Sequence, residues 1–142
     1  MLRESFTLIL KKPREQVFHS LTDFDHFAKT VGDKATVERV SGKGLGEVIR
    51  IKTPQPGAPE LLCETTEWDP PRRCARRLDL PDLPTTVAFS LEECPEGTSL
   101  TVDLTMEPKS VLYKMLIPML QQKIKEEKDK TRDLLQERLG NG

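Results

Sequence analysis

The stretch that decides the fold is KSVLYKMLIPMLQQKIKEEKDKTRDLLQERL, residues 109–139. It contains no Gly and is rich in Leu, Met, Lys, Glu, Gln and Arg, all of which favour helix. As one helix it would be about 45 Å long. Its single internal proline, Pro118, is expected to bend it by removing a backbone hydrogen bond. Because most of residues 33–107 have the pattern of strands, we predict that this helix covers a sheet.

The N-terminal part of the chain predicts one strand and two short helices. Residues 4–11 alternate apolar and polar side chains, which is typical of a strand. Pro13 suits the first turn of a helix, where its missing N–H costs nothing. A second short helix is expected at 23–30, where Asp23 can cap DFDHFAKT.

The middle of the chain predicts further strands, separated by turns rich in Gly and Pro. They are expected at 34–41, 47–53, 60–68, 72–80, 85–92 and 98–107. In the last two, apolar residues alternate with Ser, Thr, Asp and Glu, which is the pattern of an antiparallel sheet with one wet face. Strands cluster and helices segregate, so we predict an α+β fold with six to seven antiparallel strands.

Composition favours a single domain over residues 1–142. The 22 Lys+Arg and 23 Asp+Glu nearly balance, so no overall charge favours nucleic acid. The three Cys have no CxxC spacing, and we expect a reduced, cytoplasmic compartment. We expect no signal peptide, because the N-terminus lacks both an apolar stretch of about seven residues and a cleavage site. We expect no integral membrane segment, because no apolar run approaches about 18 residues.

No catalytic motif is recognisable in the sequence. Patterns such as GxSxG, the P-loop, GxGxxG and HExxH are absent. His19 and His26 are the two histidines, and no third ligand at metal-binding spacing accompanies them. Cys63 and Cys74 could be neighbours across the turn at 69–71, where packing is the expected role. We therefore assign no catalytic residue, no metal ligand and no cofactor.

Several segments occur in an order that resembles a known superfamily. They are PREQVFHSLTDFDHF (13–27), GKGLGEVIRIK (42–52), TEWDPPRRCARR (66–77), EGTSLTVDLTME (96–107) and VLYKMLIPMLQQKI (111–124). The chain is similar in these to the START-like (SRPBCC, helix-grip) superfamily, in particular to its polyketide cyclase/dehydrase-like branch. The resemblance implies a curved sheet wrapped around the long helix, with a cavity between them. The superfamily includes lipid carriers, quinone binders, cyclases and chaperone-activating domains.

The width of the predicted sheet gives a separate argument about the interior. Seven strands about 4.8 Å apart make a sheet roughly 29 Å wide. One helix is only about 10–12 Å across, so it cannot cover that face alone. The interior is then either a tightly curled, filled core or a ligand pocket.

Residues of several predicted strands and of the helix are candidates for contact with a ligand. They are Glu64, Thr66, Trp68, Arg76, Phe89, Met106, Met115 and Met119. Arg76 shares parity with Cys74 and Leu78 and could pair with a ligand carboxylate or phosphate, or internally with a residue such as Glu64. Methionine is pliable and suits irregular apolar ligands, although a Met stripe at helical spacing also fits a core.

Three functions are compatible with these patterns. The leading hypothesis is a binding protein, monomeric or weakly homodimeric, that holds a small hydrophobic or amphipathic ligand (lipid, quinone or polyketide-like) between sheet and helix. The first alternative is a cyclase, aromatase or dehydratase that uses the same cavity, with Arg76, Glu64, Thr66 and His26 as the groups to suspect. The second is a protein-interaction module resembling the chaperone-activating domains, which would expose an apolar patch on the outer face of the sheet.

Overall fold

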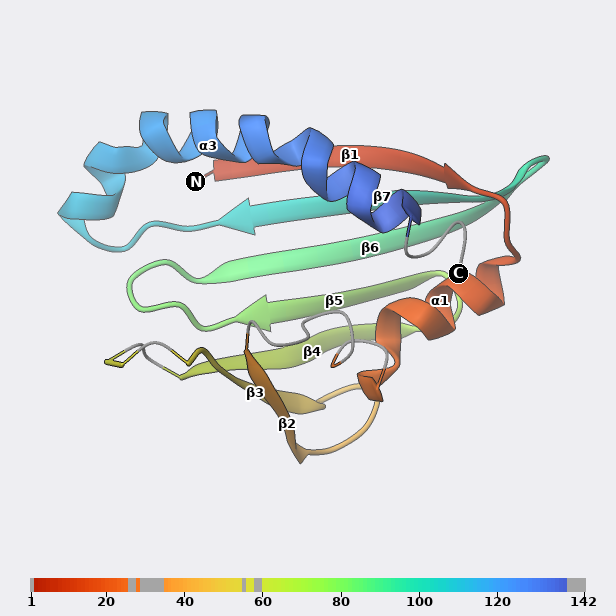
Figure 1. Ribbon diagram of the computed structural model, residues 1–142, viewed down its shortest axis with the longest axis horizontal. Coiled ribbons are helices and arrows are strands. Elements are labelled where there is room, and N and C mark those ends of the chain that lie inside the picture. The colour runs from red at the N-terminus through yellow and green to blue at the C-terminus, as the bar shows by residue number, and fades with distance from the viewer. Residues whose placement is uncertain (1, 26–27, 29–34, 55, 58–59, 138–142) are drawn as a thin grey trace.

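The computed structural model describes residues 2–25, 28, 35–54, 56–57 and 60–137 (Figure 1). The described elements are β1 (Leu2–Leu10), α1 (Arg14–Thr22), β2 (Thr36–Ser41), β3 (Val48–Lys52), β4 (Leu61–Asp69), β5 (Arg73–Leu78), β6 (Thr85–Cys94), β7 (Gly97–Met106) and α3 (Val111–Leu135). The strand bounds agree with the sequence prediction to within two residues. Half of the residues of the second short helix expected at 23–30 lie outside the described residues.

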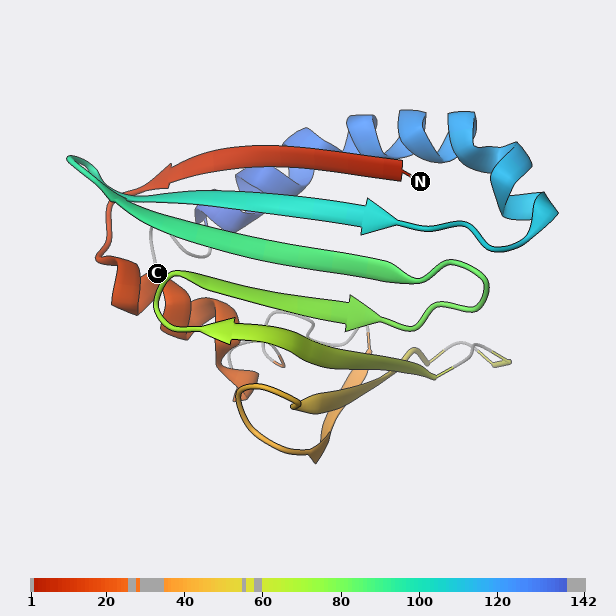
Figure 2. The ribbon, with the colours of Figure 1, turned by 180° about the vertical axis from the view of Figure 1, so that it is seen from behind.

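The seven described strands form one antiparallel sheet in the order β1-β7-β6-β5-β4-β3-β2. Strands adjacent in sequence are adjacent in the sheet from β2 to β7, and β1 closes the series by pairing with β7. Both α1 and α3 lie on one face, and the view from behind shows the strands in front of the helices (Figures 1 and 2). This arrangement confirms the predicted α+β helix-grip architecture. Of the described helices, none is long and apolar enough to cross a membrane.

The core lies where α1 packs on the inner face of the sheet. Leu10 and Leu100, from β1 and β7, are both 0% exposed. Val17 and Phe18 of α1 pack into the same cluster. The alternation of residues along each strand sends these leucines inward and their polar neighbours to the opposite face. Sheet and short helix together therefore build the tightly packed end of the molecule.

Ser110 caps the N-terminus of α3, because its side-chain oxygen accepts a hydrogen bond of 3.2 Å from the backbone N–H of Tyr113. Pro118 lies inside the helix, as predicted from the sequence. The helix packs mainly against β1 at the edge of the sheet. The inner faces of β6 and β7 are consequently only partly covered, and this leaves room beneath the helix.

A bulge in β4 changes which side chains face inward. Thr65 pairs with Arg76 but Glu67 pairs with Ala75, so Thr66 is the extra residue. The extra residue shifts the alternation by one position. Before the bulge Glu64 lies on the outer face, whereas after it Trp68 lies opposite Cys74 on the inner face.

Candidate ligand cavity

A cavity of about 410 Å³ lies between α3 and the strands β1, β6 and β7. The sheet contributes Phe6, Val87, Val102, Leu104 and Met106, and the helix contributes Leu120 and Ile124. Its walls are almost entirely apolar. Leu120 and Ile124 are one helical turn apart and both half-buried, so a single face of α3 forms the roof.

Three charged side chains also border this cavity. Glu4 comes from β1, and Lys123 and Lys128 come from α3. The Lys128 ammonium lies 3.8 Å from a carboxylate oxygen of Glu4. The Glu4 side chain is 17% exposed and the Lys128 side chain 31%, so the pair sits at the rim rather than in open solvent.

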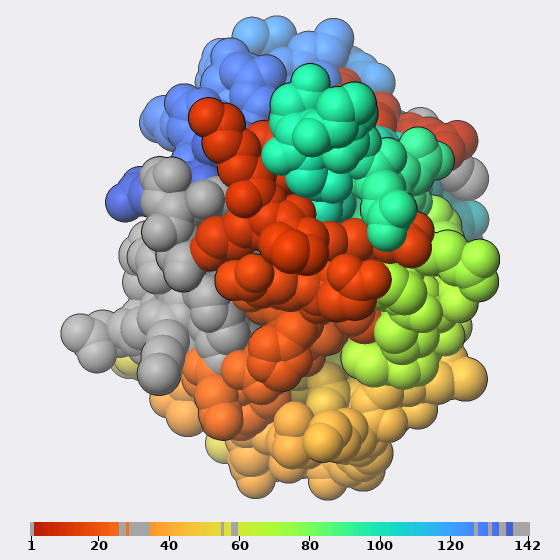
Figure 3. All heavy atoms as spheres, turned by 90° about the vertical axis from the view of Figure 1, so that its right-hand side faces the viewer, coloured from red at the N-terminus to blue at the C-terminus, as the bar shows by residue number. Residues whose placement is uncertain are grey.

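A second cavity, of about 440 Å³, lies at the opposite edge of the sheet and is bordered by α1, the β2–β3 connection and the β4–β5 turn. Figure 3 shows α1 at this end of the molecule, next to the β2–β3 hairpin. The rings of Phe18 and Trp68 meet edge to face at 5.2 Å between centroids. Arg39 forms a 3.2 Å ion pair with the buried carboxylate of Glu47 and lies 5.0 Å from the ring centroid of Phe24. These contacts connect the walls of the second cavity to one another.

Four of the candidate residues lie on the inner face. Met106 borders the cavity beneath α3, and Trp68, 38% exposed, borders the second cavity. Phe89 packs against the core cluster. Arg76 is 8% exposed and stands in the sheet between Thr65 and Val87, so the parity argument placed it on the correct face. The structure therefore spreads these residues along the inner face instead of gathering them at one site.

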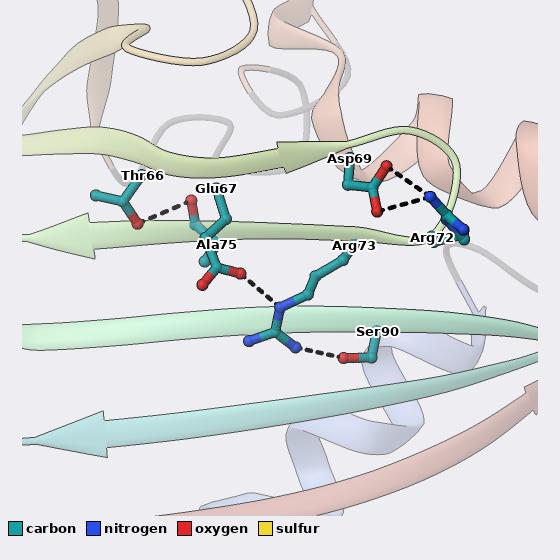
Figure 4. Close-up of polar contacts among 7 residues, drawn as sticks. All are labelled: Thr66, Glu67, Asp69, Arg72, Arg73, Ala75 and Ser90. Atoms are coloured by element: carbon teal, nitrogen blue, oxygen red, sulfur yellow. Dashed lines mark hydrogen bonds and ion pairs between the residues drawn. The ribbon is translucent and has the colours of Figure 1, made fainter.

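The other four candidates do not face either cavity. Glu64 lies on the outer face opposite Arg77. The hydroxyl of Thr66 donates to the carbonyl oxygen of Ala75 at 3.4 Å, so it bonds back to the sheet (Figure 4). Met115 and Met119 are 73% and 67% exposed.

Met115 and Met119 do not face the cavity because of how α3 is rotated about its axis. The Leu120–Ile124 face points toward the sheet and the Met115–Met119 face points away from it. For Glu64 and Thr66 the reason is the bulge described above. The four residues suspected for an enzyme are accordingly not assembled: Arg76 faces inward, Glu64 outward, and His26 lies outside the described residues.

The outer face near the bulge carries a polar network. Arg73 forms an ion pair with Glu67 and donates a 2.7 Å hydrogen bond to the hydroxyl of Ser90, which connects β4, β5 and β6 (Figure 4). Exposed apolar residues on this face are scattered: Ile9 lies on β1 and Leu62 on β4, with three strands between them. The residues described there form no continuous apolar patch of the kind expected for the interaction module.

Sequence reasoning missed most of the residues that border the cavity beneath α3. Phe6, Val87, Val102 and Leu104 all have inward parity, so the alternation identified their face correctly. What the alternation could not supply is the position of α3 over the strands. A half-buried residue on the inner face borders the cavity or fills the core depending on where the helix lies above it.

Cys63 and Cys74 are packing residues whose thiols have a raised pKa. Cys63 and Cys74 are buried, and Cys94 near the β6–β7 turn is half-buried. Burial raises the pKa of the Cys74 thiol from its ordinary 9.0 to about 11, because the thiolate would be poorly solvated. Burial likewise raises the pKa of Cys63. Among the described residues, no group of three or more His, Cys, Asp or Glu could hold a metal ion.

Alkylation of the native protein should therefore modify Cys94 first. A thiol with raised pKa holds little thiolate at pH 8, and thiolate is the reactive form. Iodoacetamide labelling followed by peptide mass spectrometry should show Cys94 modified and Cys63 and Cys74 protected until denaturant is added. Equal labelling of all three in the native state would contradict the burial of the two strand cysteines.

The raised pKa of Cys74 also makes stability depend on pH. The contribution of Cys74 to stability is present below pH 9 and is lost as the pH rises toward 11.

Comparison with known proteins places this geometry in a family. A family model described as polyketide cyclase/dehydrase and lipid transport matches residues 7–136. No curated protein matches the sequence.

Solved structures share the fold at low sequence identity. A protein of unknown function from Staphylococcus aureus is 12% identical, with 97% of this chain and 93% of that chain covered, at a TM-score of 0.75. A protein from Thermus thermophilus is 22% identical, with coverages of 97% and 95% and a TM-score of 0.67. Ara h 8.0201 is 16% identical, with coverages of 94% and 97% and a TM-score of 0.67. At these identities the likeness concerns the fold alone.

Proposed function

This chain belongs to the polyketide cyclase/dehydrase and lipid transport family, and we propose that it binds a small hydrophobic or amphipathic molecule in the cavity beneath α3. The observation that carries the proposal is the cavity itself. Its volume of about 410 Å³ falls within the range of roughly 300–1,000 Å³ that is usual for small-molecule sites. Its apolar walls favour a ligand that is largely hydrocarbon.

The energetic basis of binding is the apolar surface that a ligand would remove from water. Each Å² of such surface contributes about 25 cal/mol when it is covered. Leu104 and Met106 of β7 are only half-buried, so a ligand in the cavity would cover apolar surface that α3 leaves exposed. Met106 can adapt its flexible side chain to ligands of different shape.

Filling the cavity should weaken the binding of an apolar ligand. Leu104→Trp places a large side chain in the cavity, and we expect the affinity for the neutral dye Nile red to fall by about tenfold or more because the space for the ligand is occupied. Fluorescence titration measures this affinity. Met115→Trp is the matched control, because Met115 lies on the exposed side of the same helix and the added indole should leave binding unchanged. Equal affinity of Leu104→Trp and the original protein would place the dye elsewhere and contradict the proposal.

A further inference from the structure

More cations than carboxylates border the cavity beneath α3. Its two cations, Lys123 and Lys128, come from the helix, and its one carboxylate, Glu4, comes from β1. The carboxylate is already paired with Lys128 at 3.8 Å. Of the side chains that the structure describes, none forms an ion pair with Lys123. Among the three charged side chains that border the cavity, the cations therefore outnumber the carboxylates by one, and Lys123 is the cation that does not pair with Glu4.

The position of Lys123 suits a head group rather than a chain. Lys123 precedes Ile124 and follows Leu120 on α3, so its charge stands at the flank of the apolar roof. A lysine places its hydrocarbon stem along apolar surface and keeps its ammonium at the wet end. Lys123 is exposed as a residue, which fits an ammonium directed toward solvent at the cavity rim.

We propose that the molecule bound beneath α3 is an anionic amphiphile with one negative charge, in which an apolar chain fills the cavity and a carboxylate-type head group pairs with Lys123. The inference rests on the proposed function and specifies its ligand class. An anion compensates the excess charge at the rim. A cationic head group would be repelled by Lys123 and would compete with Lys128 for Glu4. A neutral head group such as a hydroxyl would accept a hydrogen bond from the ammonium but would lack the attraction between opposite charges.

Three ligands with the same chain length separate these cases: decanoate, decanol and decyltrimethylammonium. Each is titrated calorimetrically, the two ionic ligands below their micellar concentrations and decanol below its solubility limit. We expect decanoate to bind about fivefold more tightly than decanol, as for a partly exposed ion pair, and the cation to bind most weakly. The preference for decanoate should shrink as salt screens the pair. Equal affinity for decanoate and decanol, or tightest binding of the cation, would overturn the inference and leave the proposed function intact. Failure of all three ligands to bind would overturn the proposed function itself.

Substitutions at the rim identify the group responsible. Lys123→Gln should remove the preference for decanoate over decanol, because it deletes the charge that pairs with the carboxylate. Glu4→Gln releases Lys128 from its partner, so the preference for decanoate over decanol should grow several-fold. The matched control is Lys125→Gln, an exposed position of the same helix that does not border the cavity. A full decanoate preference in Lys123→Gln would show that another group recognises the charge and would overturn the assignment.

Discussion

Leu100→Ala is expected to lower the free energy of unfolding by about 3–5 kcal/mol. Leu100 of β7 is 0% exposed, and it stands between Leu8 of β1 and Leu91 of β6, which are also buried. Deleting its branched end leaves a void between three strands and α1, and paired strands cannot close around that void. Urea titration followed by circular dichroism measures the loss.

Leu104→Ala is the matched control, because it lies on the same strand and the same inner face. Leu104 is half-buried and borders the cavity, so its truncation enlarges an existing space instead of creating one. We expect it to cost only about 1–2 kcal/mol, since part of its surface is never removed from water. If the two substitutions cost the same, the space beneath α3 is closed in solution, and the distinction between core and cavity is wrong.

The pair shows what the alternation of residues can predict. Because side chains alternate strictly along a strand, the sequence identified Leu100 and Leu104 as members of one face, and the register of β6 with β7 confirms it. The same rule predicted the strands, and the antiparallel pairing from β2 to β7 follows because those strands are neighbours in sequence. The pairing of β1 with β7 joins residues far apart in sequence, and the alternation did not predict it. It could not separate the two leucines, because core and cavity differ only in what lies above them.

Two features kept the sequence from predicting which side chains of β4 and α3 face inward, each for a physical reason. The bulge at Thr66 has no strong local signal, and one extra residue was enough to reverse the faces of Glu64 and Trp68 relative to each other. The second feature is the N-terminal half of α3, which is apolar on more than one side. Either Met115 or Leu120 could have faced the sheet, and only packing against β1 selects Leu120.

The charged pair at the cavity rim could not be predicted from the sequence for a related reason. Glu4 and Lys128 are far apart in sequence, and their pairing depends on the position of the C-terminal helix over the first strand. Lys123 is exposed and Lys128 is half-buried beside Glu4, and nothing in their local sequence distinguishes them from the neighbouring lysines of α3.

Gly97→Ala is expected to destabilise the protein by about 3 kcal/mol or more. Gly97 begins β7 at the turn after β6, with φ of 142°, a conformation that L side chains rarely adopt. A Cβ there would collide with the carbonyl oxygen of Leu10 and lie 2.9 Å from the backbone nitrogen of Lys12. Both are backbone atoms. They are also held in place, because the hydroxyl of Thr98 donates a 2.7 Å hydrogen bond to the carbonyl oxygen of Lys12.

Gly46→Ala separates the cost of the collision from the cost of the backbone conformation. Gly46 also has positive φ, 84°, but a Cβ there would meet no heavy atom within 4 Å. Its substitution should therefore cost only the conformational penalty of about 1–2 kcal/mol. Thermal and urea unfolding of both variants measure the difference. A Gly97→Ala protein as stable as Gly46→Ala would mean that the end of β1 can move away from the β6–β7 turn. The path from β1 into α1, which fixes Val17 and Phe18 over the core, would then be less constrained than the contacts of Gly97 require.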